Sequence, residues 1–236
     1  MKKTVCILLI GMMAACTSGE DQHVYTTKTF NLKGNIKTTT ETIRPVIFDE
    51  HWSLTPDTAR MIIATVHKKH FNERSELVKS ELYDDKMNTV RRTKFSHDAS
   101  GNYTGKKDYD RYNQLKKETK VLKSGGDGIE TKTVDAGNNK VLMKTKTRYV
   151  DGKPHTRTVE NFGMGRMTAN YTYTYDKNGN ETKVIMESEY MTEGGNNITH
   201  YKYLEFDRQG NWTKRIEYRE GDENKGKLIE REIMYY

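Results

Sequence analysis

The stretch that decides the fold is Tyr175-Asp176-Lys177-Asn178-Gly179-Asn180-Glu181-Thr182. An Asp at its second position accepts hydrogen bonds from backbone N–H groups a little further along the chain. The Gly at its fifth position supplies the positive φ that a tight turn needs. The Tyr before the turn and the Thr after it are strand formers. The stretch therefore predicts a strand, a turn and a second strand, with Asp176, Gly179 and Asn180 as turn residues.

The same pattern returns along the chain. Residues 97–104 and 206–213 are clean copies, and residues 71–77 and 83–88 are looser ones. The clean copies predict six further turn residues, which are Asp98, Gly101, Asn102, Asp207, Gly210 and Asn211. The spacing of the copies leaves about eight residues for each strand. The sequence therefore predicts an all-β fold: an antiparallel meander of repeated hairpins, with about twelve to fourteen strands, forming a large open or weakly curled sheet.

Composition agrees with broad sheets that expose much of their surface. Only 33% of the residues are hydrophobic, yet the chain contains 15 Tyr. This composition is too rich in strand formers for a disordered tail. The net charge is +7, but we find no block of five like charges, so no nucleic-acid partner is predicted.

The first residues predict export. Lys2-Lys3 precedes an apolar stretch over residues 4–12, which Met13-Ala14-Ala15-Cys16 follows, and this is the pattern of a secretory signal. We expect a signal peptide at 1–15, a polar tether at 16–28 and a single β domain at 29–236. Cys6 leaves with the signal, so Cys16 is the only cysteine of the mature chain. A cysteine protease, a thiol redox enzyme and a Cys-ligated zinc protein are therefore excluded, and no cofactor is predicted.

A Cys in the first mature position makes the segment resemble a bacterial lipoprotein signal. The resemblance implies that Cys16 carries lipid and that the membrane is a partner through this anchor. In many Gram-negative lipoproteins an Asp after the Cys retains the protein at the inner membrane, and this chain has Thr17 there. The resemblance therefore implies the outer membrane, with the protein on its periplasmic or cell-surface face.

The Tyr-Asp-x-x-Gly-Asn copies resemble YD repeats, the unit of Rhs-type proteins. The chain is also similar to small repeat lipoproteins of the Gram-negative envelope. Because that family is poorly characterised, the resemblance implies architecture and export rather than an activity. The chain is far shorter than the Rhs proteins that form a β shell around a toxin, so no toxin delivery is implied.

Aromatic residues recur at strand spacing in the second half of the chain. Side chains two residues apart in a strand share a face, so these rows predict either a stacking face for sugar rings or a peptide, or the core side of the sheet. The candidate binding face comprises Tyr171, Tyr173, Tyr201, Tyr203, Trp212 and Tyr218.

One segment is ambiguous. Residues 56–70 begin with Pro56-Asp57 and are compatible with a helix, but Met61 to Val66 is rich in strand formers, and the sequence favours a strand. His67 and His70 would share a face of a helix but not of a strand, and their spacing suggests no third metal ligand. No metal site is predicted.

These observations predict a lipid-anchored envelope protein that is not an enzyme and acts as a binding or scaffold module for a glycan or an envelope protein. Two alternatives remain. One is an enzyme that acts on an envelope or extracellular polysaccharide through a pair of carboxylates that the sequence does not place. The other is a purely structural repeat protein.

Overall fold

The computed structural model describes residues 24–59, 65–126, 128–163, 165–188, 197–222 and 224–236, and the regular elements in these ranges are β-strands. The predicted signal peptide, Cys16 and the tether up to residue 23 lie outside the described residues. The strands are β1 (Ile36–Phe48), β2 (Leu54–Pro56), β3 (Thr65–Phe71), β4 (Leu77–Tyr83), β5 (Thr89–His97), β6 (Tyr103–Asp110), β7 (Leu115–Gly125), β8 (Gly128–Asp135), β9 (Val141–Val150), β10 (Lys153–Asn161), β11 (Met167–Tyr175), β12 (Glu181–Ser188), β13 (Asn197–Phe206), β14 (Trp212–Arg219) and β15 (Lys225–Tyr235).

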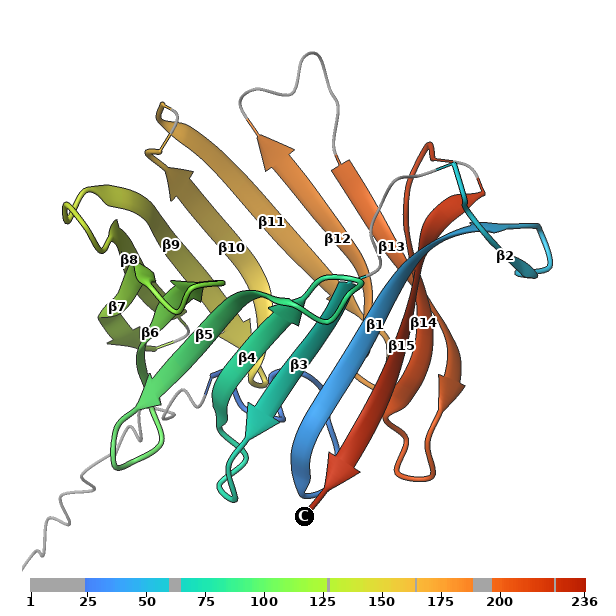
Figure 1. The fold of residues 1–236 in the computed structure, drawn as a ribbon, viewed down its shortest axis with the longest axis horizontal. Coiled ribbons are helices and arrows are strands. Elements are labelled where there is room, and N and C mark those ends of the chain that lie inside the picture. Colours follow the sequence, from blue (N-terminus) through green and yellow to red (C-terminus); the bar gives the residue numbers. More distant parts are fainter. Residues whose placement is uncertain (1–23, 60–64, 127, 164, 189–196, 223) are drawn as a thin grey trace, which may run out of the picture.

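The sheet closes on itself. From β3 to β15 each strand pairs antiparallel with the next, β3 pairs with β1, and β1 also pairs with β15 from Ile36↔Tyr235 to Ile47↔Lys225. Figure 1 shows β1 and β15 side by side, with the other long strands curving round behind them. Thirteen strands and β1 thus form a barrel, and the short β2 extends from β1.

The chain is all-β, but the predicted open or weakly curled sheet is wrong. The strand-to-strand twist has one hand, so a sheet of this many strands coils until its edges meet. Pairing β1 with β15 then satisfies the backbone groups that an open sheet would leave at both edges.

The three clean copies of the turn lie at the same end of the barrel. They join β5 to β6, β11 to β12 and β13 to β14, and antiparallel strands put such connections on one side. Gly101, Gly179 and Gly210 have φ values of 89°, 79° and 78°. In the last copy Asp207 Oδ1 accepts hydrogen bonds from the N–H groups of Gln209 and Asn211, both at 2.9 Å.

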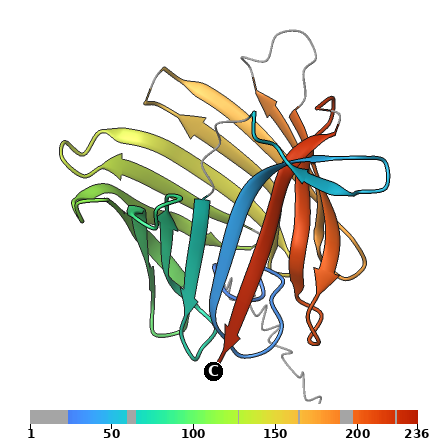
Figure 2. The same cartoon turned by 45° about the vertical axis from the view of Figure 1, so that its right-hand side comes forward.

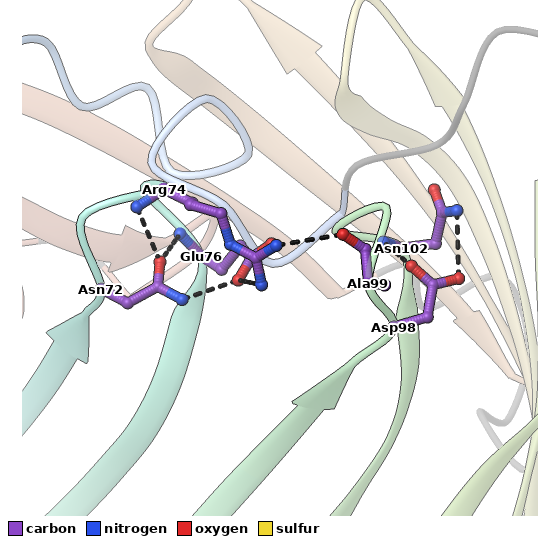
Figure 3. A network of polar contacts seen from close by, with 6 residues as sticks. All are labelled: Asn72, Arg74, Glu76, Asp98, Ala99 and Asn102. Carbon is purple, nitrogen blue, oxygen red and sulfur yellow. Dashed lines mark hydrogen bonds and ion pairs between the residues drawn. The ribbon is translucent and has the colours of Figure 1, made fainter.

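Neighbouring turns at this end are also joined to one another (Figure 3). In the β3–β4 turn Asn72 takes the place of Asp, and its Oδ1 accepts from the N–H groups of Arg74 and Glu76. Arg74 Nη2 donates to Glu76 Oε2 at 3.0 Å, and its Nη1 donates to the carbonyl of Ala99 in the β5–β6 turn at 3.1 Å. The β3–β4 and β5–β6 turns are therefore joined at this end of the barrel, which we call the rim.

Residues 24–35, which we call the plug, cross the barrel at this rim and appear in dark blue in Figures 1 and 2. Val24 is 1% exposed, the Thr27 N–H donates to Ser75 O at 2.9 Å, and the Leu77 N–H donates to Tyr25 O at 2.7 Å. The described part of the predicted tether is therefore packed into the domain. Val24, on the tether side of the predicted boundary at residue 29, belongs to a buried cluster.

The apolar core consists of three separate clusters. Two of them form around the plug: Leu32 packs with Ile36, Phe71 and Leu77, and Val24 packs with Tyr103 and Ile129. The third lies on the outer wall, where Trp52 and Leu54 from the β1–β2 hairpin pack against four buried residues, namely Val46, Phe48, Ile216 and Leu228. The plug thus supplies apolar contacts that the inner wall could not make with itself.

The ambiguous segment contains a strand. Thr65–Phe71 is β3, whereas residues 60–64 lie outside the described ranges. His67 and His70 point to opposite faces of β3, and His70 Nε2 contacts Glu81 Oε2 at 3.1 Å on the outer wall. Within the described ranges no three His, Cys, Asp or Glu side chains gather as metal ligands. The same ranges contain no helix long and apolar enough to cross a membrane.

Candidate functional site

A cavity of about 330 Å³ lies inside the barrel, between the plug and the inner wall. Tyr25, Phe30 and Asn31 of the plug form one side of it. The inner faces of the strands form the rest, and they carry both aromatic and charged side chains. The aromatic residues of the wall are Tyr149, Tyr173, Tyr175, Tyr203 and Trp212. The charged residues are Glu41, Lys69, Lys153, Arg157, Glu181, Arg215 and Arg231.

The candidate aromatic residues divide between the inner and the outer face of the barrel. Tyr173, Tyr203 and Trp212 line the cavity. Tyr171 lies directly opposite Arg157, and Tyr201 lies two residues before Tyr203 on β13, so both face inward as well. The barrel therefore gathers five of the six candidates on a concave inner wall.

Tyr218 is the exception. It faces outward, where its ring stacks on His200 at 5.3 Å between centroids and contacts Phe48 edge-on at 5.6 Å. It belongs to the apolar cluster under the β1–β2 hairpin. The flat stacking face that an open sheet would present is absent, because closure turned the aromatic rows inward.

Three charged side chains are buried together at the seam of the barrel. Glu41 on β1 binds Lys69 on β3 at 3.0 Å and Arg231 on β15 at 2.7 Å. All three residues are less than 10% exposed. Burial alone would raise the pKa of the Glu41 carboxyl, but the charges of Lys69, Arg231 and Arg215 outweigh it and hold that pKa far below its usual range. The seam trio is therefore ionised, and it links three consecutive strands across the closure.

Two further arginines of the cavity have no carboxylate partner in the described part of the chain. The Arg215 guanidinium lies 4.4 Å from the Trp212 ring centroid and 4.6 Å from that of Tyr201. The Arg157 guanidinium lies 5.8 Å from the Tyr173 ring centroid. The Nε–H of each arginine is buried without a hydrogen-bond acceptor among the described residues. Contacts with aromatic rings therefore take the place of ion pairs.

Glu181 is the second carboxyl of the cavity. Burial raises its pKa, although Arg215 lowers it and Tyr201 donates a hydrogen bond to it. Its backbone carbonyl accepts a hydrogen bond from the Tyr203 hydroxyl at 2.8 Å. This carboxyl therefore neutralises the nearby arginines only in part.

The charged half of the site was not predicted from the sequence. Strand parity offered a signal, because Arg157 alternates inward with the same period as the tyrosines and lies opposite Tyr171. The predicted meander already pairs β10 with β11, but it does not show that the sheet closes and makes this face the inner one.

The side chain of His67 on β3 points into the barrel. Its burial there predicts that the fold loses stability in acid. Burial, with the charge of Lys69, lowers its pKa to about 4, whereas in the unfolded chain its pKa is about 6.5. Below about pH 6.5 the unfolded state therefore binds a proton that the folded state refuses, and stability falls as the pH falls to about 4. Between pH 7 and pH 5 we expect the wild type to lose about 2 kcal/mol more stability than His67→Gln.

The measurement is urea unfolding at both pH values. His51→Gln is the matched control, because the side chain of His51 is 81% exposed. An equal loss of stability in the wild type and in His67→Gln would contradict the assignment.

Comparison with known proteins gives structural likeness only. No family model matches the chain, and none of the curated proteins matches it. The chain is similar to a porin-like protein from Bacteroides uniformis, at 10% identity and a TM-score of 0.41, over 84% of this chain and 98% of that one. It is also similar to a porin-like protein from Bacteroides vulgatus, at 10% identity and a TM-score of 0.38, over 83% and 97% of the two chains. A LolA superfamily protein from Nitrosomonas europaea has 8% identity and a TM-score of 0.28, over 92% and 94%. These similarities are too low to transfer a function.

Proposed function

We propose that this protein is a non-enzymatic protein of the cell envelope that binds a small ligand inside its barrel. The observation that carries the proposal is the cavity of about 330 Å³, with aromatic walls and a few buried polar groups. Ligand sites have this character and occupy about 300–1,000 Å³. A cavity of this size suits a sugar-sized part of a glycan better than the surface of a protein partner.

We further propose that a lipid on Cys16 holds the barrel at the outer membrane, with the barrel itself outside the hydrocarbon. A barrel that spans a bilayer presents an apolar band about 25 Å tall. The outer wall instead carries exposed charges in the middle of its strands, among them Lys94, Lys107, Lys120, Lys144 and Lys146. We expect Cys16→Ser to move the protein from the membrane fraction to the soluble fraction. Persistent membrane attachment of this variant would contradict the anchor.

The cavity argues against the polysaccharide-active enzyme. Glycosidases use two carboxyls, one of which donates a proton. Among the described residues the cavity is lined by two carboxyls, Glu41 and Glu181. Glu41 is held by Lys69 and Arg231, so neither of its oxygens is free to attack or to activate water. A single carboxyl, Glu181, then remains for chemistry that needs two.

Native mass spectrometry of the full-length protein, purified from envelopes, tests the proposal. We expect a bound small molecule that survives purification and is absent from Tyr173→Ala. Thr172→Ala is the matched control, because Thr172 is the next residue on β11 and is exposed on the outer wall. Thermal melting shows whether each variant is folded. If no small molecule is retained, or if it is retained equally by a folded Tyr173→Ala, the lumen is not the binding site.

A further inference from the structure

The cavity holds more positive charge than its carboxyls can balance. Its described lining includes five cationic side chains, Lys69, Lys153, Arg157, Arg215 and Arg231, against the carboxyls of Glu41 and Glu181. Glu41 is already shared between Lys69 and Arg231. The remaining carboxyl faces two arginines with which it forms no ion pair. A net positive charge is therefore enclosed in a poorly solvated space.

Such an arrangement is costly for the protein by itself. An ionised group without a partner and a donor without an acceptor both destabilise the folded protein when they are shielded from water. Arg215 is half-buried, and the hydrogen bond that it donates to a side chain within the described residues is a long one of 3.5 Å, to the Tyr203 hydroxyl. Its Nε–H and that of Arg157 have no acceptor among the described residues.

The aromatic contacts leave the useful edges of these arginines free. A ring satisfies the flat face of a guanidinium, whereas the N–H groups point outward in the plane and match the two oxygens of a carboxylate or phosphate. The Arg215 guanidinium contacts the rings of Trp212 and Tyr201, and the Arg157 guanidinium contacts the ring of Tyr173. Both guanidinium groups line the same cavity, together with the carboxyl of Glu181.

We propose that the ligand of the lumen is a small organic anion, whose carboxylate, sulfate or phosphate group pairs with the free N–H edges of Arg157 and Arg215. This inference rests on the proposed function, since it names the chemistry of the ligand for the same cavity. Tyr173 and Trp212 then contact the uncharged body of the ligand. The anion supplies the charge that Glu41 and Glu181 do not.

Calorimetric titration of the full-length protein with D-glucuronate and with D-glucose tests the charge requirement. The two sugars share a ring and differ in the carboxylate. We expect glucuronate to bind at least tenfold more tightly than glucose. Arg157→Gln and Arg215→Gln each weaken glucuronate binding at least tenfold. Arg111→Gln, in the exposed turn between β6 and β7, leaves it unchanged.

A second measurement separates a ligand-binding arginine from a structural one. Because the free protein bears the cost of the unpaired Arg157 charge, we expect Arg157→Gln to melt at the same temperature as the wild type or higher without ligand. A lower melting temperature for Arg157→Gln, with unchanged glucuronate binding, overturns the proposal. Equal affinity for glucose and glucuronate also overturns it, while leaving a ligand site in the lumen. Failure of both sugars, with no small molecule retained from envelopes, overturns the lumen site itself.

Discussion

Replacing Glu41 with Gln is expected to destabilise the barrel by about 3–5 kcal/mol, the largest effect of any single substitution considered for this chain. Gln keeps the shape of the side chain but removes the one carboxylate that Lys69 and Arg231 bind among the described residues. Both cations are buried, so water cannot solvate the two charges once the carboxylate is gone. The cost is that of leaving two buried charges uncompensated rather than that of losing two contacts.

Chemical unfolding at pH 7 measures this effect. Glu205→Gln is the matched control, because Glu205 pairs with Lys214 at 3.3 Å on the outer wall with its side chain 61% exposed, and such a pair contributes about 0–1 kcal/mol. Adding Lys69→Met to Glu41→Gln should restore part of the stability, since it removes one of the two stranded charges. A loss below about 1 kcal/mol in Glu41→Gln would show that the trio is not buried as described.

The same substitution tests closure. In an open sheet β1 and β15 would lie at opposite edges, and Arg231 could not reach Glu41. A measured coupling between Glu41 and Arg231 in a double-mutant cycle is therefore a signature of the barrel. A coupling near zero, with Lys69 still coupled to Glu41, would indicate a sheet open at the β1–β15 seam.

Local features of this fold were predictable, and the closure was not. The Asp-x-x-Gly-Asn pattern predicted turns because an Asp side chain and a positive φ act within five residues. The alternation of Tyr171 and Tyr173 predicted a shared face because strand parity is local. The pairing of Thr42 with Glu230 joins residues almost the full length of the chain apart, and neither strand carries a sequence signal that names its partner.

The candidate site shows the same division. The sequence identified the tyrosines, but whether they line a flat outer face or a lumen depends on closure. It did not identify Arg157 and Arg215, because a charged residue in a strand is ordinarily an outer-wall residue. Only the curvature of the sheet makes the inner face an enclosed space and places these two half-buried arginines in its cavity.

The repeated Asn of the turn motif is the basis of the second large prediction. Asn102, Asn180 and Asn211 occupy the same position in three copies, and in each copy the Asn N–H donates to the Asp that begins the turn. Asn211 also holds the plug: its Oδ1 accepts from the Lys33 N–H at 2.6 Å, and its Nδ2 donates to the Lys33 carbonyl at 2.9 Å. Within the described ranges Asn102 forms no such hydrogen bond with the plug, and its side-chain amide donates to Asp98 instead.

We therefore expect Asn211→Ala to cost about 2–4 kcal/mol, because it removes from a side chain that is 1% exposed two hydrogen bonds to Lys33 and one to the Tyr235 hydroxyl, each contributing about 0.5–1.5 kcal/mol. Asn102→Ala should cost about 0.5–1.5 kcal/mol, the contribution of one ordinary hydrogen bond. Asn180→Ala falls between them, since Asn180 accepts one hydrogen bond from Asn31 of the plug at 2.7 Å. The order of the three costs follows contact with the plug rather than the motif.

Hydrogen exchange shows where the stability is lost. In Asn211→Ala the amides of residues 24–35 should exchange faster than in the wild type, while amides in the middle of β7 and β8 change little, because release of the plug is a local opening at one rim. Asn102→Ala should leave plug exchange unchanged. Equal costs for Asn102→Ala and Asn211→Ala would mean that the Asn acts only within its own turn. The plug would then be held by the packing of Val24 and Leu32 and by its other hydrogen bonds, without a contribution from Asn211.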